Sequence, residues 1–139
     1  MAAMHCSLGV DEDPRAALER LARFSRVASR LPRLPRLEPR AIRTIIAGMM
    51  KDLATVSAHR GKLGIDEKLW ARVTGRCGRL LNEVARAVAT LEALIAAGAP
   101  GPHVEALREV ARVLAEDPCL AELRAVAEKT LGSDRREGS

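Results

Sequence analysis

Basic side chains with helical spacing are the residues of this sequence whose types most directly suggest chemistry. Arg72, Arg76 and Arg79 are separated by four and three residues, so an α-helix would carry them on one side. Lys62 and Lys68 stand just before them, beside a glycine-containing turn. Clustered guanidinium and ammonium groups neutralise phosphates and release their counterions. The spacing therefore predicts a surface for an anionic partner.

Three further arginines extend this predicted surface. Arg60 precedes the turn, and Arg33 and Arg36 lie in the repeated segment "RLPRLPRLEPR" at residues 30–40. Residues 14–63 contain twelve basic and three acidic residues, which concentrates positive charge in one part of the chain. Nineteen of the 23 basic residues are arginine, a bias that either phosphate recognition or GC-rich codon usage would produce.

The repeated Leu-Pro-Arg unit has two interpretations. Leu-Pro-rich segments bind SH3 domains when a basic residue stands at a fixed offset from the prolines, and here both orientations miss that offset by one residue. We therefore interpret 31–39 as a semi-rigid, extended spacer between helices. Polyproline geometry would align three leucines on one ridge that could lie on the core: Leu31, Leu34 and Leu37.

The residues that could serve catalysis or metal binding are dispersed. No Cys-x-x-Cys pair and no arrangement of nucleophile, base and acid can be inferred from the spacing. We therefore predict a protein that is not an enzyme and needs neither metal nor cofactor. The residues concerned are His5, His59, His103, Cys6, Cys77 and Cys119.

Helical segments must position the basic residues. Asp-Pro pairs at 13–14 and 117–118 are typical helix starts, Pro39 begins a second helix, and Asp66 caps a third that continues to about residue 98. We expect Gly61 to end the second helix in a left-handed conformation. The predicted organisation is a flexible acidic N-terminus at 1–13, one helical domain at 14–131 and a disordered tail at 132–139.

The predicted fold is all-α: a helical bundle built on a long antiparallel hairpin, with an N-terminal amphipathic helix and two short C-terminal helices. Long aliphatic seams with steps of four and three residues favour a homo-oligomer of coiled-coil type. Gly75 and Gly78 would mark a kink or a close crossing of backbones. The predicted oligomer interface comprises Ile42, Ile46, Met49, Leu53, Gly75, Gly78, Val84, Val88 and Leu91.

The function that these patterns favour is a helical oligomer that binds duplex DNA without strong sequence specificity, as phage, plasmid or DNA-packaging accessory proteins do. Phe24 and Trp70 are the only aromatic residues, which disfavours single-strand modules that stack bases on rings. The alternative is an adaptor, chaperone or antitoxin-like module with an acidic protein partner. No apolar run is long enough to span a membrane, so we expect a cytoplasmic location.

Overall fold

The computed structural model describes residues 13–138, with side chains described as far as Gly132. Every regular element in that part of the chain is helical, which confirms the predicted all-α class. The predicted flexible N-terminus lies, apart from Asp13, outside the described residues. The elements are α2 (Pro14–Arg30), the 3-10 helix η1 (Leu31–Arg33), α3 (Pro39–Ala58), α4 (Arg60–Leu63), α5 (Glu67–Ala96), α6 (His103–Glu116) and α7 (Pro118–Gly138).

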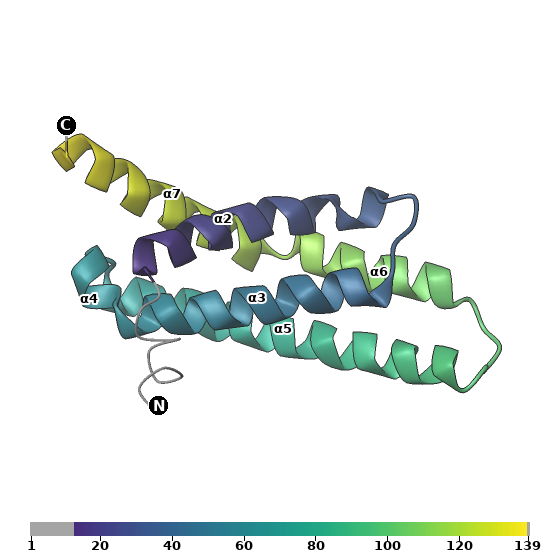
Figure 1. Ribbon diagram of the computed structural model, residues 1–139. Coiled ribbons are helices and arrows are strands. Elements are labelled where there is room, and N and C mark those ends of the chain that lie inside the picture. Colours follow the sequence, from purple (N-terminus) through teal and green to yellow (C-terminus); the bar gives the residue numbers. More distant parts are fainter. Residues whose placement is uncertain (1–12, 139) are drawn as a thin grey trace, which may run out of the picture.

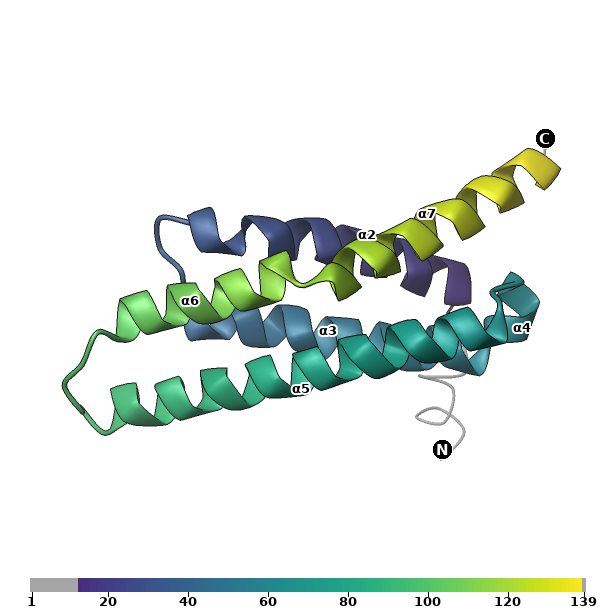
Figure 2. The same ribbon diagram turned by 180° about the vertical axis from the view of Figure 1, so that it is seen from behind.

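Four rods of helix lie alongside one another (Figures 1 and 2). The first three rods are α2, α3 and α5, and the fourth consists of α6 followed by α7. Consecutive rods run in opposite directions (Figure 1). The second rod packs against the first and the third, and the fourth rod packs against the first and the third from the other side. The arrangement encloses a core between all four rods.

Aspartates begin three of these helices, as the sequence predicts. Asp13 accepts a hydrogen bond from the backbone N–H of Arg15 at 3.0 Å, and Asp66 accepts one from Leu69 at 2.9 Å. Asp117 accepts one from the backbone N–H of Cys119 at 2.9 Å. Each cap contributes about 1 kcal/mol to helix stability. The Asp117 cap also divides the fourth rod into α6 and α7.

The core is aliphatic, as the composition requires. Trp70 is also buried, and its indole Nε1 donates to Oγ of Ser57 at 2.9 Å. Burial of one large aliphatic side chain stabilises the fold by about 1.5–3 kcal/mol. The largest fully buried apolar side chains come from all four rods: Leu18, Leu21, Leu31, Ile42, Met49, Val56, Val73, Leu81, Val88, Leu114 and Leu123.

The segment between α2 and α3 differs from the predicted extended spacer. Residues 31–33 form the 3-10 helix η1, and only residues 34–38 lack helical structure. Leu31 and Leu37 are buried, whereas Leu34 is 37% exposed, so the three leucines do not share one buried ridge. The guanidinium Nη1 of Arg108 donates to the carbonyl oxygens of Pro32 at 2.7 Å and Leu34 at 2.9 Å. The segment is held by α6 as well as by its prolines.

The turn between α3 and α5 contains one more helical turn than expected. Gly61 lies within α4, and the left-handed residue is Gly64, with φ of 74°. The prediction that Gly61 terminates the helix in that conformation is therefore wrong by three residues. The reason is that Arg60–Leu63 forms a separate short helix, which Gly64 ends.

Neither glycine of α5 marks a kink or a close contact with another of the described residues. The helix is continuous from Glu67 to Ala96, and a Cβ added to Gly75 or Gly78 would meet nothing within 4 Å. Close contact at a glycine occurs instead in α3, where a Cβ on Gly48 would lie 2.5 Å from Cζ of Phe24. The Phe24 ring of α2 packs directly over this glycine.

The last helix is longer than the sequence predicts. α7 runs over 21 residues to Gly138, whereas the expected helix was short and ended near residue 131. Residues 132–138 are polar but contain no proline, and of their two glycines Gly138 is the last residue of the helix, while Gly132 costs only about 1 kcal/mol within it. The backbone of the predicted disordered tail is thus helical up to Gly138. No helix within 13–138 is both long and apolar enough to cross a membrane.

Candidate functional site

The side chains capable of acid, base or metal chemistry do not assemble within the described residues. No group of three or more histidine, cysteine, aspartate or glutamate side chains in that part of the chain could hold a metal ion. Nε2 of His103 lies 2.6 Å from the carbonyl oxygen of Ala99, to which it donates as the N–H tautomer. His103 therefore closes the α5–α6 connection.

Cys77 and Cys119 form the one buried cluster of reactive side chains that the structure describes. Both are free thiols with no exposed surface, and Sγ of Cys77 lies 3.4 Å from the carbonyl oxygen of Cys119. Contact with the Cys77 side chain and burial raise the pKa of the Cys119 thiol far above its ordinary range. A thiol held protonated is a poor nucleophile and a poor metal ligand.

Basic side chains line the outer face of α5. Lys68, Arg72, Arg79 and Arg86 are all exposed and lie opposite the buried seam of the helix. We call these four residues the α5 basic stripe. Their steps of four, seven and seven residues keep them aligned, because seven residues make almost two turns. At 1.5 Å per residue the stripe is about 27 Å long.

The α5 basic stripe carries uncompensated charge. Among the described residues, none of its four members forms an ion pair, and two acidic residues of the same helix adjoin it, Glu67 beside Lys68 and Glu83 between Arg79 and Arg86. Two other charges on α5 are paired across rods: Arg76 Nη1 lies 3.2 Å from Oε2 of Glu122, and Glu92 pairs with Arg43 at 2.8 Å. The outward face therefore presents positive charge to solvent.

Two of the predicted anion-binding residues have structural partners instead. Nη1 of Arg60 donates to the carbonyl oxygen of Ile65 at 2.7 Å, which fixes the turn after α4. Arg76 is rotated away from the stripe toward α7, where Glu122 holds it. Both guanidinium groups contribute positive potential but are less available to a ligand than Arg72 or Arg79.

The remaining predicted arginines lie at the other end of the molecule. Arg33 and Arg36 belong to the α2–α3 connection, opposite the end that carries α4 (Figure 1). Both side chains are exposed. The eight predicted residues therefore do not converge on one patch, and only Lys62, Lys68, Arg72 and Arg79 remain together with free cationic groups.

The predicted oligomer interface is mostly occupied by the chain's own core. Seven of its nine residues are at most 8% exposed, because α2, α3, α5 and the fourth rod cover one another: Ile42, Ile46, Met49, Leu53, Val84, Val88 and Leu91. A second copy could reach these side chains only if the rods separated. Gly75 is exposed and lies in line with the α5 basic stripe, and Gly78 is half-buried beside it.

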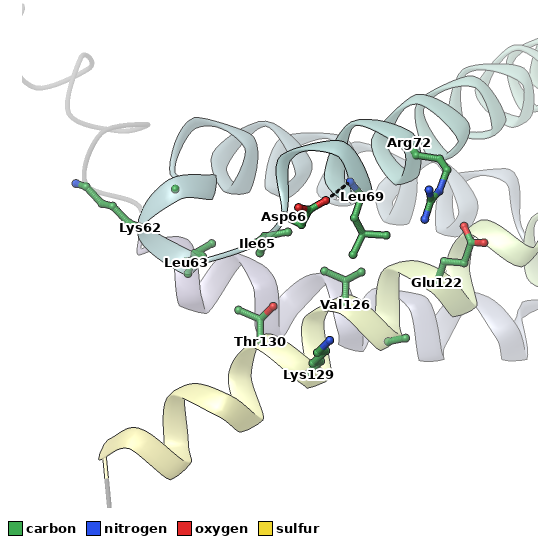
Figure 3. A pocket seen from close by; sticks show the side chains of 13 residues that line it. Lys62, Leu63, Ile65, Asp66, Leu69, Arg72, Glu122, Val126, Lys129 and Thr130 are labelled. Carbon is green, nitrogen blue, oxygen red and sulfur yellow. Dashed lines mark hydrogen bonds between the residues drawn. The ribbon is translucent and has the colours of Figure 1, made fainter.

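A pocket opens where the α4 turn, the start of α5 and the middle of α7 meet (Figure 3). Its volume is about 660 Å³. Leu69 of α5 and Val126 of α7 approach each other across its centre, with Leu63 and Ile65 beside them (Figure 3). Cationic side chains from all three elements belong to its lining: Lys62, Arg72 and Lys129.

Several residues of this surface were not among the predicted site residues. Arg86 follows Arg79 by seven residues, so continuation of the heptad spacing is the signal that could have identified it. Lys129 gave no such signal, because its place beside the α4 turn depends on how α7 packs. The ion pair of Arg20 with Asp52 was also missed for lack of a local pattern.

Comparison of the chain with protein-family models, with curated proteins and with solved structures gave no match.

Proposed function

We propose that this chain is a non-enzymatic helical protein that binds the phosphate backbone of duplex DNA through the α5 basic stripe. The observation that carries the proposal is the line of four exposed, unpaired cations on the outer face of one long helix. A row of such groups attracts a polyanion and gains entropy when counterions leave the nucleic acid. Acidic residues of α5, which would repel phosphates, adjoin the row at Glu67 and Glu83, so the cations outnumber them two to one.

The proposal favours contact with the backbone over readout of bases. Trp70 lies in the core and Phe24 packs over Gly48, so neither ring is available for stacking on unpaired bases. Contacts to phosphates position a protein on a duplex and carry no sequence information by themselves. We therefore expect affinity for duplexes of any sequence.

Gly75 supports this mode of binding. It lies between Arg72 and Arg79, and the space above its Cα is open. A partner's backbone can approach the helix more closely at glycine than at any other residue.

The proposal also covers the scaffold and the location of the protein. We propose that α3 and α5 form an antiparallel hairpin that holds the stripe outward, and that the protein acts in the cytoplasm, where DNA is accessible.

Self-association is part of the same proposal, because two copies would double the number of phosphate contacts. Large apolar side chains that remain exposed at the α5–α6 end are the residues available for it: Leu94 (40%), Ile95 (47%) and Val104 (65%). Sedimentation equilibrium measures the mass in solution. If the measured mass is that of one chain at all concentrations, the self-association part of the proposal is wrong. The proposal that the α5 basic stripe binds DNA would not be affected.

The salt dependence of binding tests the proposal. Fluorescence anisotropy of a labelled random duplex is measured at about 50 and about 200 mM salt. Four phosphate contacts predict a loss of affinity on the order of 100-fold between these conditions. No binding at the lower concentration would contradict the proposal.

A triple variant locates the binding surface. Lys68→Gln, Arg79→Gln and Arg86→Gln together should make the logarithmic salt slope about three units shallower. The matched control removes three exposed arginines from α2 and α3, namely Arg23, Arg30 and Arg40, again as glutamine. Equal losses of DNA affinity in the two variants would show that binding depends on the net charge of the protein and not on the α5 basic stripe. The same titration with labelled polyglutamate tests the alternative of an acidic protein partner.

A further inference from the structure

The pocket between α4, α5 and α7 combines an apolar floor with a charged rim. Leu63, Ile65, Leu69 and Val126 provide the floor, and Ile65 and Val126 are less than one-tenth exposed. A volume of about 660 Å³ lies within the range of roughly 300–1,000 Å³ that is typical of small-molecule sites. An apolar group of a ligand would displace water from this floor, and the hydrophobic effect favours that exchange.

The charge that the pocket offers a ligand is positive. Both of its acidic residues have partners in the structure, because Asp66 caps α5 through the N–H of Leu69 at 2.9 Å and Glu122 pairs with Arg76 at 3.2 Å. Lys62, Arg72 and Lys129 form no ion pair within the described part of the chain. Asp66 keeps its own negative charge, because a backbone N–H does not neutralise a carboxylate, so the lining has three cations without an ion pair against one such carboxylate and stays net positive.

We propose that this pocket binds a small organic anion with an aliphatic body, of the alkyl carboxylate class. The aliphatic chain lies between Leu69 and Val126, and the carboxylate reaches Arg72 or Lys129, the latter on the same helix as Val126 (Figure 3). The side chain of Lys62 extends away from the centre of the pocket (Figure 3). An inorganic anion would leave the floor in water, and an alkyl cation would meet like charge on the rim. An amphipathic anion is the class of ligand that matches both the apolar floor and the cationic rim.

The position of Trp70 makes binding measurable without a label. Trp70 is the only tryptophan, follows the pocket residue Leu69 directly and is itself buried. Its fluorescence is followed during titration with sodium decanoate, with decanol and decyltrimethylammonium as probes of equal chain length, all below the concentrations at which they aggregate. We expect saturable binding of decanoate, at least tenfold tighter than either other probe. Equal affinity for the three probes, or no saturable response to decanoate, would overturn the proposal.

Two pairs of variants test the rim and the floor separately. Lys129→Gln should weaken decanoate binding by about tenfold, as expected for loss of one charge-assisted contact, while Arg124→Gln on the same helix, outside the lining, should not. Ala125→Phe places a ring in the pocket, whereas Ala121→Phe, at the exposed position one turn earlier, does not. All four positions are exposed or half-exposed, so the variants should fold, which thermal unfolding verifies.

The outcome for these pairs decides the site. If Lys129→Gln and Ala125→Phe bind decanoate as their controls do, the ligand lies elsewhere and the proposal fails. The variant Lys68→Gln, Arg79→Gln, Arg86→Gln changes none of the lining residues. This variant should bind decanoate as the original protein does. Failure of the DNA-binding proposal can therefore be distinguished from failure of the pocket proposal.

Discussion

Arg20 of α2 holds the carboxylate of Asp52 of α3 with two nitrogen atoms, Nη2 at 3.0 Å from Oδ1 and Nε at 3.2 Å from Oδ2. The side chain of Asp52 is 2% exposed, whereas that of Arg20 is 32% exposed. A carboxylate removed from water depends on its partner for the stability of its charge. The pair therefore fixes how α2 and α3 pack, since sliding either helix would leave Asp52 buried alone.

Removing the arginine should be more damaging than removing both charges. We expect Arg20→Met to lower the free energy of unfolding by about 3 kcal/mol, because Asp52 stays buried without its partner. The double variant Arg20→Met, Asp52→Leu should regain part of that loss. Urea denaturation measures both. A single variant within about 0.5 kcal/mol of the original protein would mean that the pair does not hold the helices together.

The sequence alone predicted where several helices begin, but it predicted less well how the helices pack against one another. Asp-Pro pairs and the cap at Asp66 identify helix starts, because those signals act within one turn of the chain. The closure of four rods depends on contacts distant in sequence, such as Ser25 Oγ donating to the carbonyl oxygen of Leu120 at 2.9 Å. No local pattern specifies such a pair. This is why a long apolar seam predicts a partner helix without indicating whether that helix belongs to the same chain or to another copy.

The candidate site illustrates the same limit. Spacing correctly indicated that Arg72 and Arg79 share a helix face, but it could not reveal that Arg76 pairs with Glu122 of α7. Consecutive steps of four residues rotate around a helix, whereas steps of seven return nearly to the same side. Arg86 therefore belongs to the stripe and Arg76 faces the neighbouring rod. The pocket was beyond prediction because three separate elements build it.

Arg108 should stabilise the connection between α2 and α3. Its guanidinium donates to the carbonyl oxygens of Pro32 and Leu34, and hydrogen bonds to charged groups contribute about 1.5–3 kcal/mol each at most. We expect Arg108→Met to cost about 1–2 kcal/mol in urea denaturation, because solvent reaches part of the site. Arg112→Met, one turn later, removes only a surface pair with Glu109 and should cost less than 0.5 kcal/mol. Equal effects at the two positions would contradict the assignment.

Alanine at two glycines should have opposite effects on stability. Gly75 is exposed with nothing within 4 Å of an added Cβ, so Gly75→Ala should stabilise the protein by about 1 kcal/mol through helix propensity. Gly48→Ala places a Cβ 2.5 Å from the Phe24 ring, and displacing a packed ring costs about 1–3 kcal/mol. We expect net destabilisation, measured as the shift of the thermal midpoint.

The size of the Phe24 ring provides the control. Phe24→Leu shortens the side chain over Gly48, so Gly48→Ala should be less costly in that background than in the original protein. An unchanged cost would place the strain elsewhere in α3. Stabilisation by both alanine substitutions in the original sequence would show that the ring moves freely.

Stability should decline at alkaline pH because of Cys119. Contact with Cys77 and burial raise the pKa of its thiol in the folded state, while the unfolded chain releases that proton above the ordinary pKa of 9.0. The unfolded state then binds fewer protons than the folded state, so the free energy of unfolding falls as pH rises, by at most about 1.4 kcal/mol per unit. Between pH 8 and 10, with reductant present, the original protein should lose about 1 kcal/mol more than Cys119→Ala does. The comparison uses the change with pH, so the cavity left by the alanine does not enter. Parallel pH profiles for the two proteins would show that the thiol ionises as readily in the folded bundle as in the unfolded chain.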